Sequence, residues 1–154
     1  MPDVPRVEAG DESCLMDPID RALADLEPLD TDDLVERRVA SLIGRAVSRQ
    51  IWLLFVDAGD TQLPLVMPIS DVPVAPEAGD LHNWTELVRG TAEAVHANGV
   101  VVVIERYDAE RLTDADRAWA RLSLDGCRDA GVRLRAILLS HRRGVRLLAP
   151  DDYA

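Results

Sequence analysis

The strongest constraint on the fold is a run of five β-branched residues, Val100 to Ile104, that ends in Glu105. β-branched side chains favour strands, and an apolar run without alternation is typical of a strand buried on both faces. We therefore predict a central strand of an α/β domain. Ligands of open α/β sheets bind outside the carboxyl ends of such strands, so the segment after Glu105 is the first place to search for a site.

Length and composition bound the class of protein. The chain has 154 residues, of which 47% are hydrophobic, and this is enough for one domain with a core. Its longest apolar run is far below the roughly 18 residues of a membrane span. Because Met1 to Pro5 is not a basic segment followed by an apolar one, we expect no signal peptide and a cytoplasmic location. Cys14 and Cys127 lack the spacing of a metal or redox motif, so both are expected to be reduced.

The net charge of -11 is unevenly distributed. Residues 1–33 hold 11 acidic and 2 basic groups, whereas the remaining residues hold 17 acidic groups and 15 arginines. Phosphate binding depends on a surplus of basic groups, so we expect no binding to nucleic acid. We divide the chain into an acidic N-terminal extension, residues 1–30, and a single α/β domain, residues 31–154.

The extension is predicted to contain a short amphipathic helix. Asp17 is a suitable N-cap, and Pro18 suits the first helical position. Ile19, Leu23 and Leu26 follow at helical spacing and form an apolar stripe among acidic residues. Two interpretations stay open: the helix is a lid on its own domain, or it docks on a partner or on a second copy of the chain.

Apolar periodicity and turn residues predict the order of elements in the domain. A helix begins after caps at Asp30 to Asp33 and runs to about Arg49, and a strand with Pro64 and Pro68 is expected at an edge of the sheet. Thr113 is predicted to cap the last helix. The other predicted elements are strands at 51–56, 62–69, 132–139 and 145–148 and helices at 81–97 and 113–130. The resulting fold is a mixed sheet of about five strands with helices packed against it, a layered sandwich.

From about Leu34 to Tyr153 this order resembles the RadC-type branch of the JAB/MPN metallohydrolase fold. Thr113-Asp-Ala-Asp116 resembles the Ser-x-x-Asp that follows the zinc motif of that family. The family's spacing puts Val103 and Glu105 where its two zinc-binding histidines stand, so the resemblance does not imply zinc hydrolysis. The order is also similar to that of an uncharacterised actinobacterial domain family, which implies no activity.

Several polar side chains can meet at the end of the central strand. They are Glu105, Asp108, Asp116 and His141. Carboxylate oxygens suit a hard divalent cation, with Asp108 and Asp116 as candidate metal ligands. In the alternative interpretation, Asp114 and Asp116 cap their helix while Glu105 pairs with Arg106 or Arg117.

A basic surface is the second candidate. Arg133 and Arg135 alternate with apolar residues, and with Arg142, Arg143 and Arg146 they are predicted to form one basic end. This end is either a solvated hairpin or the docking site of an acidic extension from the same or another chain.

Our leading hypothesis is a small soluble, non-catalytic interaction or accessory module without a cofactor, acting as a homo-oligomer or with a protein partner. The alternative is a hydrolase that depends on a divalent cation held at the end of the central strand.

Overall fold

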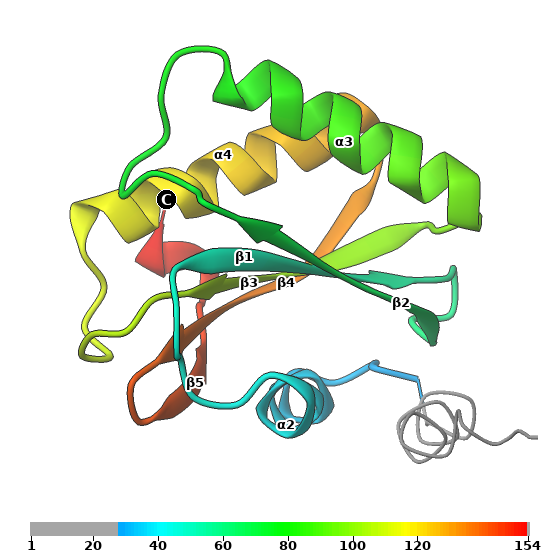
Figure 1. Cartoon of the computed structure of the whole chain (residues 1–154). Helices are drawn as coiled ribbons and strands as arrows, with labels where there is room; N and C mark the ends of the chain where they lie inside the picture. The colour runs from blue at the N-terminus through cyan, green and yellow to red at the C-terminus, as the bar shows by residue number, and fades with distance from the viewer. Residues whose placement is uncertain (1–27, 154) are drawn as a thin grey trace, which may run out of the picture.

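A computed structural model describes residues 28–153 as five strands, three α-helices and one short 3₁₀ turn (Figure 1). The predicted helix with Ile19, Leu23 and Leu26 lies outside the described residues. The elements in chain order are α2 (Asp32–Leu42), β1 (Gln50–Val56), β2 (Gln62–Ser70), α3 (Asp80–Val95), β3 (Gly99–Glu105), α4 (Asp114–Ala130), β4 (Arg133–His141), β5 (Gly144–Leu147) and η3 (Pro150–Asp152).

The strands form one mixed sheet in the order β2-β1-β3-β4-β5. Strand β3 is antiparallel to β1 and parallel to β4, and the two hairpins β1–β2 and β4–β5 supply the antiparallel edges. Every residue of β3 is buried, which confirms the valine run as the central strand. The proline-containing strand β2 lies at an edge, as predicted.

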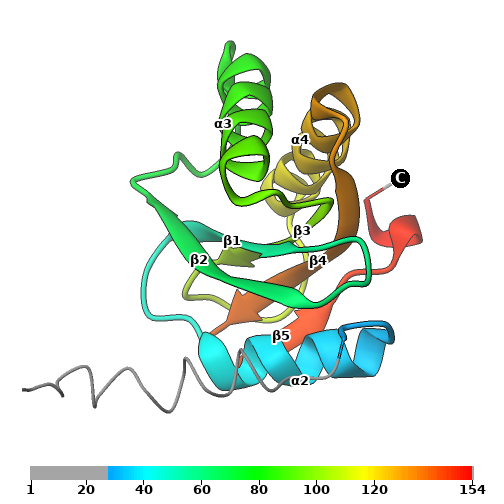
Figure 2. The ribbon, with the colours of Figure 1, turned by 90° about the vertical axis from the view of Figure 1, so that its right-hand side faces the viewer.

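Helices cover both faces of the sheet, so the predicted layered α/β sandwich is confirmed (Figure 2). On one face α3 and α4 pack over Val100, Val102 and Ile104. On the other face α2 packs over Val101 and Val103. Since successive strand residues point to opposite faces, the two cores share β3, and its end delivers side chains to both layers. No helix within residues 28–153 has the length and apolarity needed to cross a membrane.

The prediction that the first helix of the domain continues to Arg49 is wrong. Helix α2 ends at Leu42, and Gly44 takes a left-handed conformation with φ of 70°. Such a backbone ends a helix at little cost when the residue is glycine. Residues 43–49 instead form an irregular segment of turns and bends, which we call the strap, that leads into β1 (Figure 2). Arg45 and Arg49 are therefore exposed residues of the strap and not of a helix end.

The last helix begins as the sequence predicts. The Thr113 side chain accepts a hydrogen bond from the Asp116 backbone N–H, and the Asp116 carboxylate accepts one from the Thr113 N–H. This reciprocal capping box fixes the start of α4. Trp119 of this helix and Trp84 of α3 are buried in the core, whereas Trp52 is half-buried on the opposite face.

Candidate functional site at the end of the central strand

Three loops meet at the carboxyl ends of β3 and β4. They are the strap, the loop 106–113 and the β4–β5 turn. Backbone bonds join them: the Ala46 N–H donates to the His141 carbonyl at 2.8 Å, and the Arg142 N–H donates to the Asp108 carbonyl at 2.9 Å. The Ser140 hydroxyl also donates to the Gly44 carbonyl at 2.6 Å. The region that the sequence nominated is thus a closely bonded junction.

Glu105 is the buried carboxylate on the α2 side of this junction, with 2% of its surface exposed. Oε2 accepts hydrogen bonds from the backbone N–H groups of Val47 at 2.7 Å and Ser48 at 2.9 Å. Oε1 accepts from Gln50 Nε2 at 2.9 Å and Trp52 Nε1 at 2.8 Å. All four donors are neutral, so the prediction that Glu105 pairs with Arg106 or Arg117 is wrong. The carboxylate instead ties the strap to the sheet.

These donors determine the charge state of Glu105. Burial alone raises the pKa of the carboxyl, but the hydrogen bonds from Val47, Trp52, Ser48 and Gln50 outweigh it and hold the pKa below its ordinary value. Glu105 is therefore ionised at neutral pH, although no cation among residues 28–153 forms an ion pair with it.

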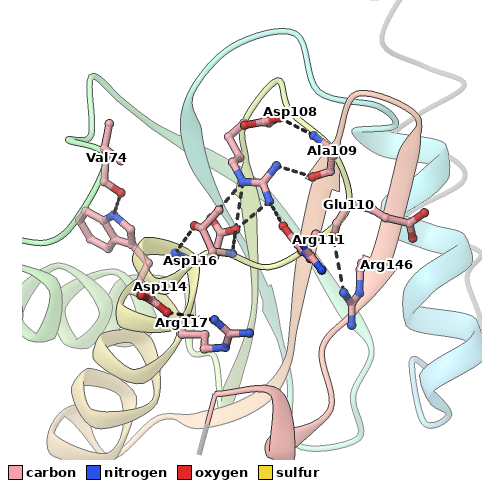
Figure 3. A network of polar contacts seen from close by, with 12 residues as sticks. Val74, Asp108, Ala109, Glu110, Arg111, Asp114, Asp116, Arg117 and Arg146 are labelled. Carbon is pink, nitrogen blue, oxygen red and sulfur yellow. Dashed lines mark hydrogen bonds and ion pairs between the residues drawn. The ribbon is translucent and has the colours of Figure 1, made fainter.

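Asp116 is the buried carboxylate on the opposite side, and its partner is Arg106. The guanidinium Nε lies 3.0 Å from both Asp116 oxygens, and Nη2 lies 2.7 Å from Oδ2. The remaining donors of Arg106 bind the carbonyls of Ala109 at 2.7 Å and Arg111 at 2.8 Å (Figure 3). Both side chains of the ion pair are at most 4% exposed. The predicted capping role of Asp116 is confirmed, but the guanidinium was not foreseen.

The environment of Asp116 favours its charged form. Burial raises the pKa of the carboxyl, whereas the hydrogen bonds from Arg106 and Thr113 and the charge of Arg106 lower it more, so the net pKa is below its ordinary value. Arg106 supplies the positive charge that a metal ion would otherwise bring to this carboxylate.

The other two predicted site residues do not join either carboxylate. Asp108 is exposed, and its carboxylate accepts a bond from the next backbone N–H, that of Ala109, at 2.7 Å. His141 is 5% exposed, and its Nδ1 accepts from the Arg143 N–H at 3.3 Å. Burial lowers the pKa of His141, a direction that nearby arginines reinforce and Glu110 opposes. The imidazole is therefore neutral at pH 7.

The predicted residues therefore converge on the same junction without forming a metal centre. Across residues 28–153, no group of three or more His, Cys, Asp or Glu side chains is arranged to hold a metal ion. Glu105 and Arg106 are successive residues at the end of β3, so their side chains point to opposite faces: Glu105 binds the strap, and Arg106 binds Asp116.

The predicted single basic end is wrong. Arg133 and Arg135 lie at the start of β4, whereas Arg142 and Arg143 lie in the turn after its end. Arg133 pairs with Asp60 at 2.7 Å, and Arg135 pairs with Asp32 at 3.1 Å and donates to the Leu29 carbonyl. The six strand residues 136–141 separate Arg135 from Arg142, so alternation along β4 cannot bring the two pairs of arginines together.

A pocket of about 250 Å³ lies on the α3 side of the sheet, and the sequence did not indicate it. Apolar and aromatic side chains dominate its lining, and two carboxylates, Asp71 and Asp80, also line it. Its lining residues come from β1, β2, the β2–α3 connection, α3 and α4. We call it the α3 pocket; its principal lining residues are Ile51, Ile69, Val72, Trp84, Leu87 and Trp119.

Neither the scan against models of protein families nor the search of curated proteins found a match to this chain.

Proposed function

We propose that this chain is a non-catalytic interaction or accessory module that associates with itself or with a protein partner. The observation that carries the proposal is the state of the buried carboxylates at the end of β3. Asp116 is held by a guanidinium that makes five hydrogen bonds, and Glu105 by four neutral donors. Both groups are used to stabilise the fold, and neither is presented to a substrate.

The alternative, a cation-dependent hydrolase, requires a different arrangement of the same residues. A metal ion at Asp116 would have to displace a guanidinium that is 4% exposed. Losing one partner of a buried ion pair costs about 3–5 kcal/mol, so this exchange is unfavourable. The resemblance to the RadC-like JAB/MPN branch stays a proposal about fold, in which this chain would lack the zinc site.

Thermal unfolding with Mg²⁺, Mn²⁺ and Zn²⁺ separates the two functions. A cation present at 100 times its dissociation constant stabilises a folded protein by about 2.7 kcal/mol, which is a readily measured shift. We expect no shift with any of the three ions. A stabilisation that is abolished by Asp108→Asn would support the hydrolase and overturn our proposal.

We further propose a cytoplasmic location and no role in binding nucleic acid. The uneven charge supports the second point, since the residues after position 33 have a net charge of -2. Fluorescence anisotropy with duplex DNA and with single-stranded RNA tests it, and salt-sensitive binding to either would contradict it.

A further inference from the structure

The strap presents one apolar side chain to solvent. Val47 is 78% exposed, the highest exposure among the large hydrophobic residues of the described part of the chain. Its backbone N–H and that of Ser48 are bound by Glu105, and the preceding N–H, of Ala46, is bound by His141. Three consecutive amides therefore anchor the strap. Because this backbone is already ordered, little conformational entropy is lost when a partner binds the exposed Val47 side chain.

The charge around Val47 is positive. Arg45 and Arg49, two residues before and two residues after Val47 in the chain, are exposed, and the strap contains no acidic residue. Neither arginine forms an ion pair with another residue of 28–153. The strap is thus an apolar side chain between two cations.

The α3 pocket has the complementary character. Its volume of about 250 Å³ is below the roughly 300–1,000 Å³ of sites for small-molecule ligands, so it suits one or two apolar side chains. Asp71 and Asp80 line it together with apolar residues, and the connection 71–80 carries three acidic residues and no basic one. Leu87, which lines the pocket, and Leu81 at the start of α3 are both exposed apolar residues.

The strap and the α3 pocket lie at the same end of β1. The strap runs directly into Gln50, and Ile51, the next residue, lines the pocket. Figure 2 shows the strap and the β2–α3 connection on one side of the molecule. When a protein carries a projection and a complementary recess on one side, two copies can pair about a two-fold axis. Each copy then inserts its projection into the recess of the other, and the assembly closes as a dimer.

We propose that two copies of this chain associate through this end, with Val47 of each copy seated in the α3 pocket of the other. Arg45 and Arg49 then face the acidic connection of the second copy. This inference rests on the proposed self-association and specifies the surface that carries it.

The test compares the mass in solution of full-length variants by sedimentation over a series of protein concentrations. Val47→Asp puts a negative charge into the acid-lined pocket, and Leu87→Asp does so from the pocket side. We expect each to raise the dissociation constant of the dimer by at least about tenfold, because each buries a charge in place of an apolar side chain. Ser41→Asp adds the same charge to an exposed position of α2 outside the strap and should leave the dimer intact. Circular dichroism confirms that each variant is folded.

The outcomes distinguish this inference from the proposed function. A wild-type dimer that persists in both Val47→Asp and Leu87→Asp overturns the strap-in-pocket contact and leaves self-association standing. A wild-type chain that stays monomeric at every concentration overturns both self-association and the contact.

Cross-linking gives an independent result. The Val47→Cys variant and an affinity-tagged Leu87→Cys variant, both with Cys14→Ser, are mixed and oxidised. Cys127 is buried, which raises the pKa of its thiol to about 12 and keeps it unreactive. We expect a mixed disulfide that depends on position 47, and a Ser41→Cys control that does not form it. Equal cross-linking by Ser41→Cys and Val47→Cys would overturn the contact.

Discussion

Glu105 and Asp116 are equally buried carboxylates, each 2% exposed, but they are stabilised in different ways. Glu105 accepts hydrogen bonds from neutral groups of the strap and β1, whereas Asp116 binds a guanidinium from the loop after β3. The charge of Glu105 is stabilised by several neutral dipoles, whereas the charge of Asp116 is balanced mainly by one cation, Arg106. A single substitution therefore removes the main partner of Asp116 but only a fraction of the donors to Glu105.

Removal of the guanidinium should have the largest effect. Arg106→Met leaves Asp116 charged and buried without its counter-ion, and it frees the carbonyls of Ala109 and Arg111. Breaking a buried pair in this way costs about 3–5 kcal/mol. Urea unfolding should show this loss in the free energy of unfolding.

The matched control is Arg117→Met, because Arg117 pairs with Asp114 at 3.2 Å at the surface. Exposed pairs contribute about 0–1 kcal/mol, so this variant should be nearly as stable as the wild type. The double variant Arg106→Met/Asp116→Leu should recover part of the loss, since it removes both charges of the buried pair. Equal losses in Arg106→Met and Arg117→Met would contradict our account of the pair.

Neutralisation of Glu105 should have a smaller effect. Glu105→Gln keeps the shape but replaces one of the two acceptor oxygens by an NH2 group that cannot accept, so two of the four donors lose their acceptor. Hydrogen bonds to charged groups contribute about 1.5–3 kcal/mol, and we expect a loss in that range.

Hydrogen exchange locates this loss. The amides of Val47 and Ser48 should exchange faster in Glu105→Gln, because the charged acceptor that protects them is gone. The exposed Glu110→Gln serves as the control and should leave their exchange unchanged. Unchanged strap amides in Glu105→Gln would show that the carboxylate does not anchor the strap.

The two carboxylates should behave alike in acid. Both have a folded-state pKa below the unfolded values of about 3.9 for Asp and 4.3 for Glu. The unfolded chain then binds more protons than the folded one as the pH falls, so their contribution is fully present above about pH 5 and is lost below it. Between pH 7 and pH 3, the free energy of unfolding should fall less steeply for Glu105→Gln and for Asp116→Asn than for the wild type. A wild-type slope in either variant would contradict the lowered pKa of that group.

Removal of one neutral donor should have the smallest effect. Trp52→Phe deletes the indole N–H that lies 2.8 Å from Glu105 and keeps most of the aromatic surface. Three donors remain to stabilise the charge, so we expect a loss near the lower end of the range for a bond to a charged group, about 1.5 kcal/mol, and below that of Glu105→Gln. Urea midpoints of the two variants measure the difference, and a larger loss in Trp52→Phe would show that packing of the ring outweighs its hydrogen bond.

The sequence predicted the elements well where a local signal specified them. The valine run marked the central strand, Pro64 and Pro68 marked the edge strand, and Thr113 with Asp116 marked the start of α4. The prediction failed at residues 43–49, where apolar spacing favoured a helix but Gly44 ended it. The strap residues are held by bonds to β3 and β4, which a window along the sequence does not contain.

The candidate site was predicted less well. The rule that sites lie at strand ends pointed to the junction at the end of β3, but it did not predict which groups form hydrogen bonds and ion pairs within it. The sequence did contain one usable signal: the charged residues Glu105 and Arg106 directly follow an apolar run. Charged side chains at the end of a buried strand require partners, so their pairing with other groups could have been predicted. The α3 pocket had no signal, since its lining comes from β1, β2, the β2–α3 connection, α3 and α4.

The order of elements along the chain and the burial of β3 follow from the sequence, because periodicity, β-branching and capping act over a few neighbouring residues. The groups that satisfy the charges at the end of that strand are set by how the elements pack. The donors to Glu105 lie 53 to 58 residues away in the chain, and the sheet brings them within hydrogen-bonding distance. Pairings over such separations depend on how the layers pack, so the same carboxylates that suggest a metal site in the sequence are ties between elements in the folded protein.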